Sequence, residues 1–108
     1  MKILVLRTIH YYIRKYPNAE RALISWVNEF EKIEFCNFND IKAVYRNASI
    51  VGNNRIIFNI KGNDFRLIVS ANFKQQACYV IWFGMHKEYD MIDAETIAYD
   101  KRINNFKK

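Results

Sequence analysis

Glycine and proline are scarce in this sequence: its 108 residues contain three glycines and one proline. Such a composition argues against a disordered chain. Hydrophobic residues make up 51% of the sequence and aromatic residues 16%, so the chain is able to bury a substantial core. Its length suits one domain and leaves little room for two.

Long apolar runs are also missing. No run reaches the roughly 18 residues that a membrane-spanning helix requires, and residues 1–6 are too short an apolar stretch for a signal peptide. The two cysteines, Cys36 and Cys78, stand apart, without a CxxC pair or a nearby pair of histidines. We therefore expect a cytoplasmic protein with two free, buried thiols rather than a disulfide or a zinc site.

The sequence contains no HExxH, GxxxxGK[S/T] or GxGxxG motif, so neither a metal nor a nucleotide cofactor is expected. Its charge is unbalanced, with 17 Lys or Arg against 11 Asp or Glu and a net charge of +6. A small basic domain attracts polyanions, of which nucleic acid is the commonest in a cell. Many proteins are basic for solubility alone, so charge by itself leaves both explanations open.

Apolar spacing predicts a strand and two helices in residues 1–33. Residues 3–6 are continuously apolar, as in a buried strand. Thr8 should cap a helix whose apolar positions 9, 12, 13 and 16 share one face, and Pro17 should end it. Asn18 should cap the next helix, in which positions 23, 26, 27 and 30 repeat that spacing.

A β-hairpin is predicted over residues 55–61 and 64–70, because both segments alternate and Gly62-Asn63 between them is a two-residue turn signal. A tight turn there would place three facing pairs on one side of the sheet: Lys61 with Asp64, Asn59 with Arg66, and Arg55 with Ser70. The opposite side would be apolar and covered by the helices.

The remaining segments complete an α+β domain. Asp40 should cap a short helix over 41–46, residues 49–51 should form a brief strand, and residues 78–83, apolar on both faces, a central strand. We expect a small, mostly antiparallel sheet with a helical hairpin on one face and the other face partly polar and free. Residues 1–97 would be the single domain, and the basic tail 98–108 either a short final helix or a frayed end.

Cations gather between residues 41 and 76, where six Lys or Arg accompany one acidic residue, Asp64. Such a cluster binds phosphates through charge and counterion release. We predict a basic nucleic-acid-binding groove made of six residues: Lys42, Arg46, Arg55, Asn59, Lys61 and Lys74. The alternative is a solvated face held by cross-strand pairs such as Lys61–Asp64.

Two features could carry chemistry. Arg66 lies mid-strand between large apolar residues, where an arginine is costly unless it has a partner or a task. The segment 86–90 (HKEYD) follows the predicted central strand, and a helical turn there would put His86, Tyr89 and Asp90 on one side. Asp90 would orient His86 for proton transfer, and Tyr89 would stack on a base or donate a proton. A purely structural strand-to-helix junction is the alternative, because H-x-x-Y-D alone is a weak signal.

Three segments together carry a more specific pattern: 43–49 (AVYRNAS), 55–69 (RIIFNIKGNDFRLIV) and 86–97 (HKEYDMIDAETI). The combination of N-I-x-G-N-x-F-R-L with H-x-E-Y-D at this spacing resembles the HigB-type toxins, which are RelE-like toxic halves of type II toxin–antitoxin pairs. The similarity covers about residues 1–97, and the tail lies outside it.

The resemblance implies a RelE-like α+β fold and metal-free cleavage of mRNA, generally on translating ribosomes, with a helix-turn-helix, HigA-like antitoxin as partner. It also implies that Arg66 lies near the scissile phosphate and that His86, Tyr89 and Asp90 form the catalytic patch. In the chemistry of RNA cleavage, His86 and Tyr89 suit the base and the acid, while Arg66 and Lys87 suit the cation that stabilises the phosphorane.

Two other functions remain open on the sequence. A non-catalytic RNA-binding module would use the same basic face and leave the RNA intact, and an interaction protein would dock a partner through its apolar and aromatic surface. A binding module does not need a proton-transfer pair beside an arginine, so His86, Tyr89 and Arg66 favour the endoribonuclease.

Overall fold

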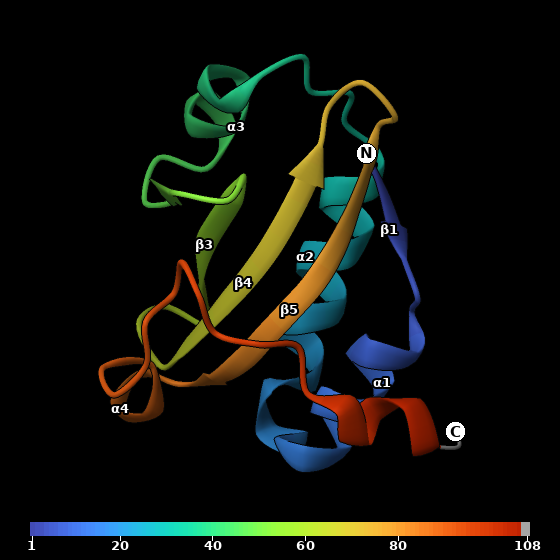
Figure 1. Cartoon of the computed structure of the whole chain (residues 1–108), viewed down its shortest axis with the longest axis vertical. Helices are drawn as coiled ribbons and strands as arrows, with labels where there is room; N and C mark the ends of the chain where they lie inside the picture. The colour runs from blue at the N-terminus through green and yellow to red at the C-terminus, as the bar shows by residue number, and fades with distance from the viewer. Residues whose placement is uncertain (107–108) are drawn as a thin grey trace.

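Five strands form one sheet in the computed structural model, which describes residues 1–106 (Figure 1). The strands are β1 (Lys2–Leu4), β2 (Ser49–Val51), β3 (Arg55–Ile60), β4 (Phe65–Asn72) and β5 (Ala77–Met85). Their order in the sheet is β1-β5-β4-β3-β2, and all neighbours are antiparallel except β1 and β5, which are parallel. The predicted α+β class and mostly antiparallel sheet are confirmed.

The helical segments lie mainly at the two ends of the chain. They are α1 (Arg7–Lys15), the 3₁₀ turn η1 (Pro17–Ala19), α2 (Glu20–Glu31), α3 (Phe38–Val44), the single turn α4 (His86–Tyr89) and the 3₁₀ helix η2 (Lys101–Asn105). The predicted helical hairpin is α1 with α2, which bury Tyr12, Leu23 and Phe30 in the core. Apolar burial on this one face of the sheet holds the domain together.

The starts of the first two helices differ from those predicted. Thr8 does not cap α1: Leu6 precedes the helix, and Thr8 is buried in its first turn. Pro17 follows α1 as expected and opens η1, where its missing N–H leaves no donor unsatisfied. Asn18 lies within η1, so Ala19 occupies the N-cap position of α2.

The short third helix begins earlier than predicted. Its cap is Asn37, whose side chain accepts a hydrogen bond from the backbone N–H of Asp40 at 3.0 Å. Asp40 accepts from the N–H of Cys36 and lies in the first turn of α3. Both polar side chains suit a cap, and the extended backbone of Asn37 decides which of them takes that position.

The predicted hairpin register is confirmed. Asn59 pairs with Arg66 and Arg55 with Ser70, and residues 61–64 form the turn. The backbone turns through positive φ at Lys61 and Gly62, and the N–H of Asp64 donates to the carbonyl of Lys61 at 3.2 Å. The apolar side of the hairpin is buried as predicted, at six positions: Ile56, Phe58, Ile60, Phe65, Leu67 and Val69.

The opposite face of the sheet is less free than predicted. The chain after α4 crosses this face in front of β4 and β5 (Figure 1). Arg55 holds it there, because its Nη1 donates to the carbonyls of Ala94 and Ile97, both at 2.9 Å. Ile57 and Ile68, on the polar side of the strand alternation, are also buried. Two isoleucines among polar neighbours would be costly to leave in water, which explains the cover.

The segment after residue 97 packs against α1. Asp100 caps η2 through the N–H of Arg102 and accepts a hydrogen bond from the Tyr11 hydroxyl at 3.2 Å. Ile103 is fully buried. Of the two alternatives for this segment, the structure has the short helix for residues 101–105, while positions 107 and 108 of the predicted tail lie outside the described residues. The division into a domain 1–97 and a tail 98–108 stays a prediction.

The first strand and the cysteines correct two further expectations. β1 ends at Leu4, and Val5 and Leu6, predicted to lie in a buried strand, are exposed. Both cysteines are free as expected, but Cys36 is exposed and Cys78 alone is buried, which raises the pKa of its thiol to about 12. Within residues 1–106, each helix is too short or too polar to cross a membrane.

Candidate active site

Arg66 and the turn α4 meet at one end of the β4–β5 pair. Arg66 is in register with Gly84, and α4 follows β5 without a gap. The guanidinium carbon of Arg66 lies 5.9 Å from the centroid of the Tyr89 ring, within the range of a cation–π contact. The prediction that the end of the central strand delivers this segment to the edge that carries Arg66 is confirmed.

The Arg66 side chain is half-buried and held by the backbone of the adjoining turn. Its Nη1 donates to the carbonyls of Asn63 at 3.1 Å and Phe65 at 3.2 Å. These bonds supply the partner that a mid-strand arginine requires. They occupy one terminal nitrogen, so Nε and Nη2 make no hydrogen bond within residues 1–106, and no carboxylate of these residues pairs with the guanidinium.

His86 and Asp90 lie side by side on α4, as their spacing predicts. Their Nε2 and Oδ1 atoms are 3.4 Å apart, and the side chains are 50% and 59% exposed. An ion pair this exposed contributes little to stability because water screens it. That Asp90 orients the His86 imidazole stays a prediction, which this distance supports.

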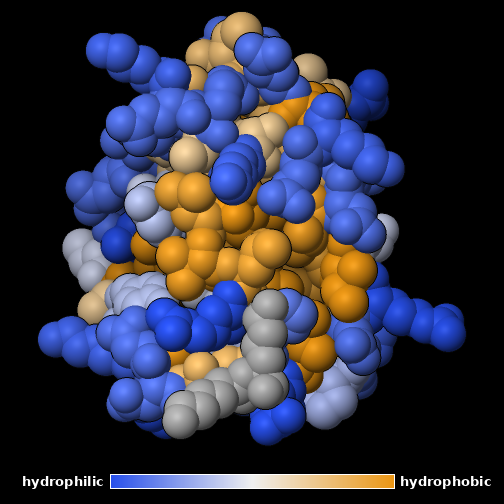
Figure 2. Space-filling view, turned by 90° about the vertical axis from the view of Figure 1, so that its right-hand side faces the viewer, coloured by the Kyte–Doolittle hydropathy of each residue, from blue (hydrophilic) through white to orange (hydrophobic). Residues whose placement is uncertain are grey.

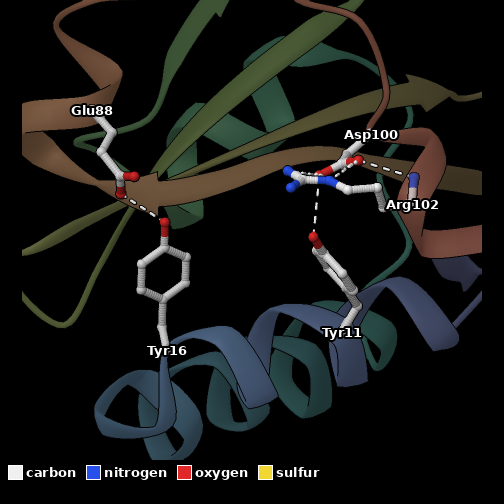
Figure 3. A network of polar contacts seen from close by, with 5 residues as sticks. All are labelled: Tyr11, Tyr16, Glu88, Asp100 and Arg102. Atoms are coloured by element: carbon white, nitrogen blue, oxygen red, sulfur yellow. Dashed lines mark hydrogen bonds and ion pairs between the residues drawn. The ribbon is translucent and has the colours of Figure 1, made fainter. Parts of the chain in front are cut away.

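Glu88 has a role that the sequence analysis missed. Its Oε1 accepts hydrogen bonds from the Tyr16 hydroxyl at 2.7 Å and from the N–H of Met85 at 2.8 Å (Figure 3). Burial, followed by this contact with Glu88, raises the pKa of Tyr16. The carboxylate therefore ties the end of α1 to the turn that carries His86 and Tyr89. A glutamate at the third position of a helical turn is a capping signal that could have been noticed.

Gly84 and Trp82 pack closely behind α4. A Cβ atom on Gly84 would lie 2.7 Å from the Trp82 ring and 3.1 Å from Oε1 of Glu88. The Trp82 and Tyr89 ring centroids are 6.3 Å apart. Because glycine leaves this space open, Trp82 and Glu88 can both support the turn. Nothing in the sequence pattern singles out Trp82, since its contact depends on the exact bend between β5 and α4.

A hollow of about 490 Å³ lies beside His86 and Lys87. Phe65 and Met85 contribute apolar surface to it, and Asn18, Asn63 and Asp64 contribute polar groups. The N–H of His86 donates to the Asp64 carbonyl at 3.0 Å, which joins α4 to the hairpin turn. The hollow therefore combines apolar and polar lining next to the histidine.

The predicted basic groove is divided between two ends of the sheet. Lys61 and Asn59 lie near Arg66, and the Asn59 side chain is 3.5 Å from that of Asn63. Lys42 and Arg46 belong to α3 and the loop after it, and Lys74 to the turn after β4. The eight residues of β4 separate the two ends by roughly 26 Å.

Two of the predicted groove residues also have structural contacts. The Lys42 ammonium donates to the carbonyls of Arg46 at 2.9 Å and Ala48 at 2.5 Å, and Arg55 holds the segment that crosses the sheet. RNA binding by the six groove residues stays a prediction. Over residues 1–106, the His, Cys, Asp and Glu side chains do not gather in threes as metal ligands do.

The residues of this site lie within the part of the chain that matches a family of toxins. A family model described as HigB_toxin, a RelE-like toxic component of a toxin-antitoxin system, matches residues 19–92, which include Arg66 and the whole 86–90 segment. The chain is also similar to the mRNA interferase toxin HigB of Escherichia coli (strain K12) and to mRNA interferase HigB of Escherichia coli O157:H7 and Shigella flexneri. Each is 27% identical over 96 residues, covering 87% of this chain and 92% of the relative.

Proposed function

The chain belongs to the HigB family of RelE-like toxins, and we propose that it is an endoribonuclease that inhibits translation by cleaving mRNA. One observation carries the proposal: the Arg66 guanidinium lies 5.9 Å from the Tyr89 ring, with the His86–Asp90 pair on the same turn. The similar Escherichia coli protein is named an mRNA interferase, which supports the same activity.

The proposed reaction uses the 2′-hydroxyl of the RNA as nucleophile. It attacks the adjacent phosphorus, the bond to the 5′-oxygen breaks, and the products are a 2′,3′-cyclic phosphate and a 5′-hydroxyl. His86 and Tyr89 share the tasks of removing the proton from the 2′-oxygen and returning one to the leaving oxygen. Arg66 and Lys87 offset the charge that develops on the phosphorane. Side chains perform each task, so this route is metal-free.

We call the end of the β4–β5 pair where Arg66 meets His86 and Tyr89 the corner. The substrate is an RNA segment bound across this corner. A base would enter the hollow beside His86 and Lys87, whose apolar surface suits stacking. We propose that the translating ribosome presents the mRNA, because an open site with few contacts gains most from a substrate that is already held in place. A HigA-like, helix-turn-helix antitoxin would neutralise the toxin in a cytoplasmic complex.

The test is to incubate the purified chain with translating ribosomes and map the ends of the cleaved mRNA. We expect 2′,3′-cyclic phosphate ends, and no cleavage at a site whose attacking nucleotide is 2′-deoxy. Cleavage of the deoxy substrate, or 5′-phosphate products, would contradict the metal-free route. Cleavage of free mRNA at the same rate would contradict the need for a ribosome.

The alternative is a non-catalytic RNA-binding module, and variants of the proposed catalytic residues distinguish it from an endoribonuclease. Tyr89→Phe and His86→Gln should each cut cleavage sharply and leave RNA binding nearly unchanged, with Tyr79→Phe, an exposed tyrosine elsewhere, as the matched control. If Tyr89→Phe is active and Tyr89→Ala is not, the ring only stacks, and the acid is His86 or Lys87. A wild-type chain that stops translation while the mRNA stays intact would support the binding module.

A further inference from the structure

An exposed apolar hollow lies where β1 ends and α1 begins. It has a volume of about 380 Å³ and is lined in part by Leu4, Val5, Tyr79 and Ile81, which we call the apolar notch. Figure 2 shows this side of the molecule, where apolar side chains form a broad central area with hydrophilic ones around it. Single exposed apolar residues are ordinary, but a continuous apolar area with a polar rim is typical of an interaction surface.

The exposure of the notch is built into the backbone. Val5 is 45% exposed, its neighbour Leu6 41%, and Tyr79 50%. Val5 has a φ of 58°, a left-handed conformation that a β-branched residue adopts only at a cost. The turn from β1 into α1, closed by the N–H of Thr8 on the Val5 carbonyl at 3.0 Å, therefore holds an apolar side chain out in solvent.

Pairing with another strand does not explain this surface. β1 is an edge strand of only three residues, and the N–H of Ile3 already donates to the Glu31 carboxylate at 3.2 Å. A short edge blocked by a charged side chain discourages strand addition. A partner would instead bind through the apolar side chains of the notch.

The surrounding charge defines the partner further. The first 19 residues contain four Lys or Arg and no Asp or Glu, and residues 101–106 add Lys101 and Arg102 without an acidic residue. Arg7 is one of the residues that line the hollow. Asp100, which follows the lining residue Tyr99, is already paired with Arg102 at 2.8 Å. A second copy of this chain, with its net charge of +6, would meet like charge here. An acidic partner is complementary.

We propose that the apolar notch is the docking site of the antitoxin, which binds it with a segment that combines apolar and acidic side chains. The inference rests on the proposed function for the existence of an antitoxin, and it adds the surface and the chemistry of contact. Arg66 and His86 do not line the notch. Substitutions in the notch therefore abolish neutralisation and leave RNA cleavage unchanged.

The experiment is calorimetric titration, without RNA, of this chain with the product of the reading frame beside its gene. Val5→Glu should weaken binding by about 100-fold or more, as expected of a central contact. Val44→Glu is the matched control, because Val44 on α3 is 48% exposed, and it should bind within about twofold of wild type, as surface positions outside an interface do. Both variants should keep the wild-type thermal midpoint.

Two more variants test the contact if Val5→Glu does not fold. Leu6→Glu places an acid at the N-cap of α1, where it does not oppose the helix, and it should weaken binding as well. Arg7→Glu should weaken binding by roughly tenfold and flatten its dependence on salt. Binding to wild type that does not respond to salt would contradict an acidic partner.

Other results would overturn the proposal. It fails if wild type does not bind the neighbouring product, or if Val5→Glu and Leu6→Glu both bind it as tightly as wild type does. It also fails if wild type forms a dimer in sedimentation that Val5→Glu dissociates, because a second copy then occupies the notch. A wild-type chain that binds the product at the notch but does not cleave RNA would contradict the proposed function and leave the docking site intact.

Discussion

Two regions adjoin β5: the apolar notch, and the corner where Arg66 meets α4. Their side chains are held in opposite ways. At the corner, polar groups are fixed by specific bonds: Arg66 by two backbone carbonyls and Glu88 by Tyr16 and Met85. At the notch, the apolar side chains lie at the surface, and Val5 and Tyr79 are about half exposed. Proton transfer requires fixed directions, whereas docking requires accessible apolar area.

The comparison implies that the two regions can be altered separately. A substitution at the corner should change the rate of RNA cleavage and leave antitoxin binding intact, and one in the notch should do the reverse. Sites without shared contacts usually behave independently.

Arg66→Ala should have the largest effect. Removing one contact to the transition-state charge should lower the cleavage rate by about 10²-fold or more. Antitoxin affinity should stay at the wild-type value, with only a small fall in the thermal midpoint, because the arginine is half-buried and packs no core. Single-turnover cleavage, calorimetry and thermal unfolding measure the three quantities, with Arg21→Ala as the control. A large fall in the midpoint would mean that Arg66 is structural.

Tyr16→Phe should have a smaller effect on the same region. It removes the hydrogen bond to Glu88 and should loosen α4, lowering kcat by roughly tenfold with KM unchanged, as for a group that positions others. Tyr11→Phe is the matched control, because Tyr11 bonds Asp100 on the tail side instead (Figure 3). Glu88→Gln keeps an acceptor for Tyr16 and should retain more activity than Glu88→Ala. Equal activity of these two Glu88 variants would contradict a positioning role.

Replacing the lysine at either end of β4 should weaken RNA binding, and this effect should be smaller than those of Arg66→Ala and Tyr16→Phe. Lys61→Ala should weaken binding of a short RNA that reaches only the corner and lower its salt slope by about one phosphate contact. Lys74→Ala, at the far end, should affect only longer RNA or the ribosome. Fluorescence titration at several salt concentrations measures both. If Lys74→Ala weakens the short RNA equally, the RNA follows a different path.

The smallest effect concerns pH and the segment beside the notch. The hydrogen bond and ion pair with Arg102 lower the pKa of Asp100 to about 2, below its ordinary 3.8. A lowered pKa in the folded state means that the contact stabilises above about pH 4 and is lost as pH falls toward 2. The protection of amides in residues 99–106, measured as their exchange rate relative to the intrinsic rate at the same pH, should therefore fall at low pH, with no matching change in α4. The Asp100→Asn variant should lose this pH dependence.

The corner was predictable from the sequence because local rules fix it. The alternation of two strands and their turn set the register that places Arg66 on the polar face. The helical period then brings His86 next to Asp90. Each step depends on neighbours in the chain, so residue order alone was sufficient.

The notch, the contact of Tyr16 with Glu88 and the cover over the polar face were not predictable, because local rules do not fix them. Residues 3–6 form an apolar run that looks the same whether its side chains face the core or the solvent, and the break at Val5 depends on a single φ angle. The contact of Tyr16 with Glu88 was missed because it joins residues far apart in the sequence. The cover over the polar face was missed because Arg55 was interpreted by its charge rather than by the carbonyls it holds.

The parallel pairing of β1 with β5 also has a consequence for the time at which the protein becomes active. Residues 2–4 pair with residues 77–79, so the first strand has no partner in the sheet until β5 has been synthesised. Such distant pairing forms slowly compared with helices and hairpins. The residues of α4 are added only after β5, so shorter nascent chains lack the corner altogether. A nascent chain therefore cannot place Arg66 beside Tyr89, or His86 beside Asp90, before residue 90 has been added.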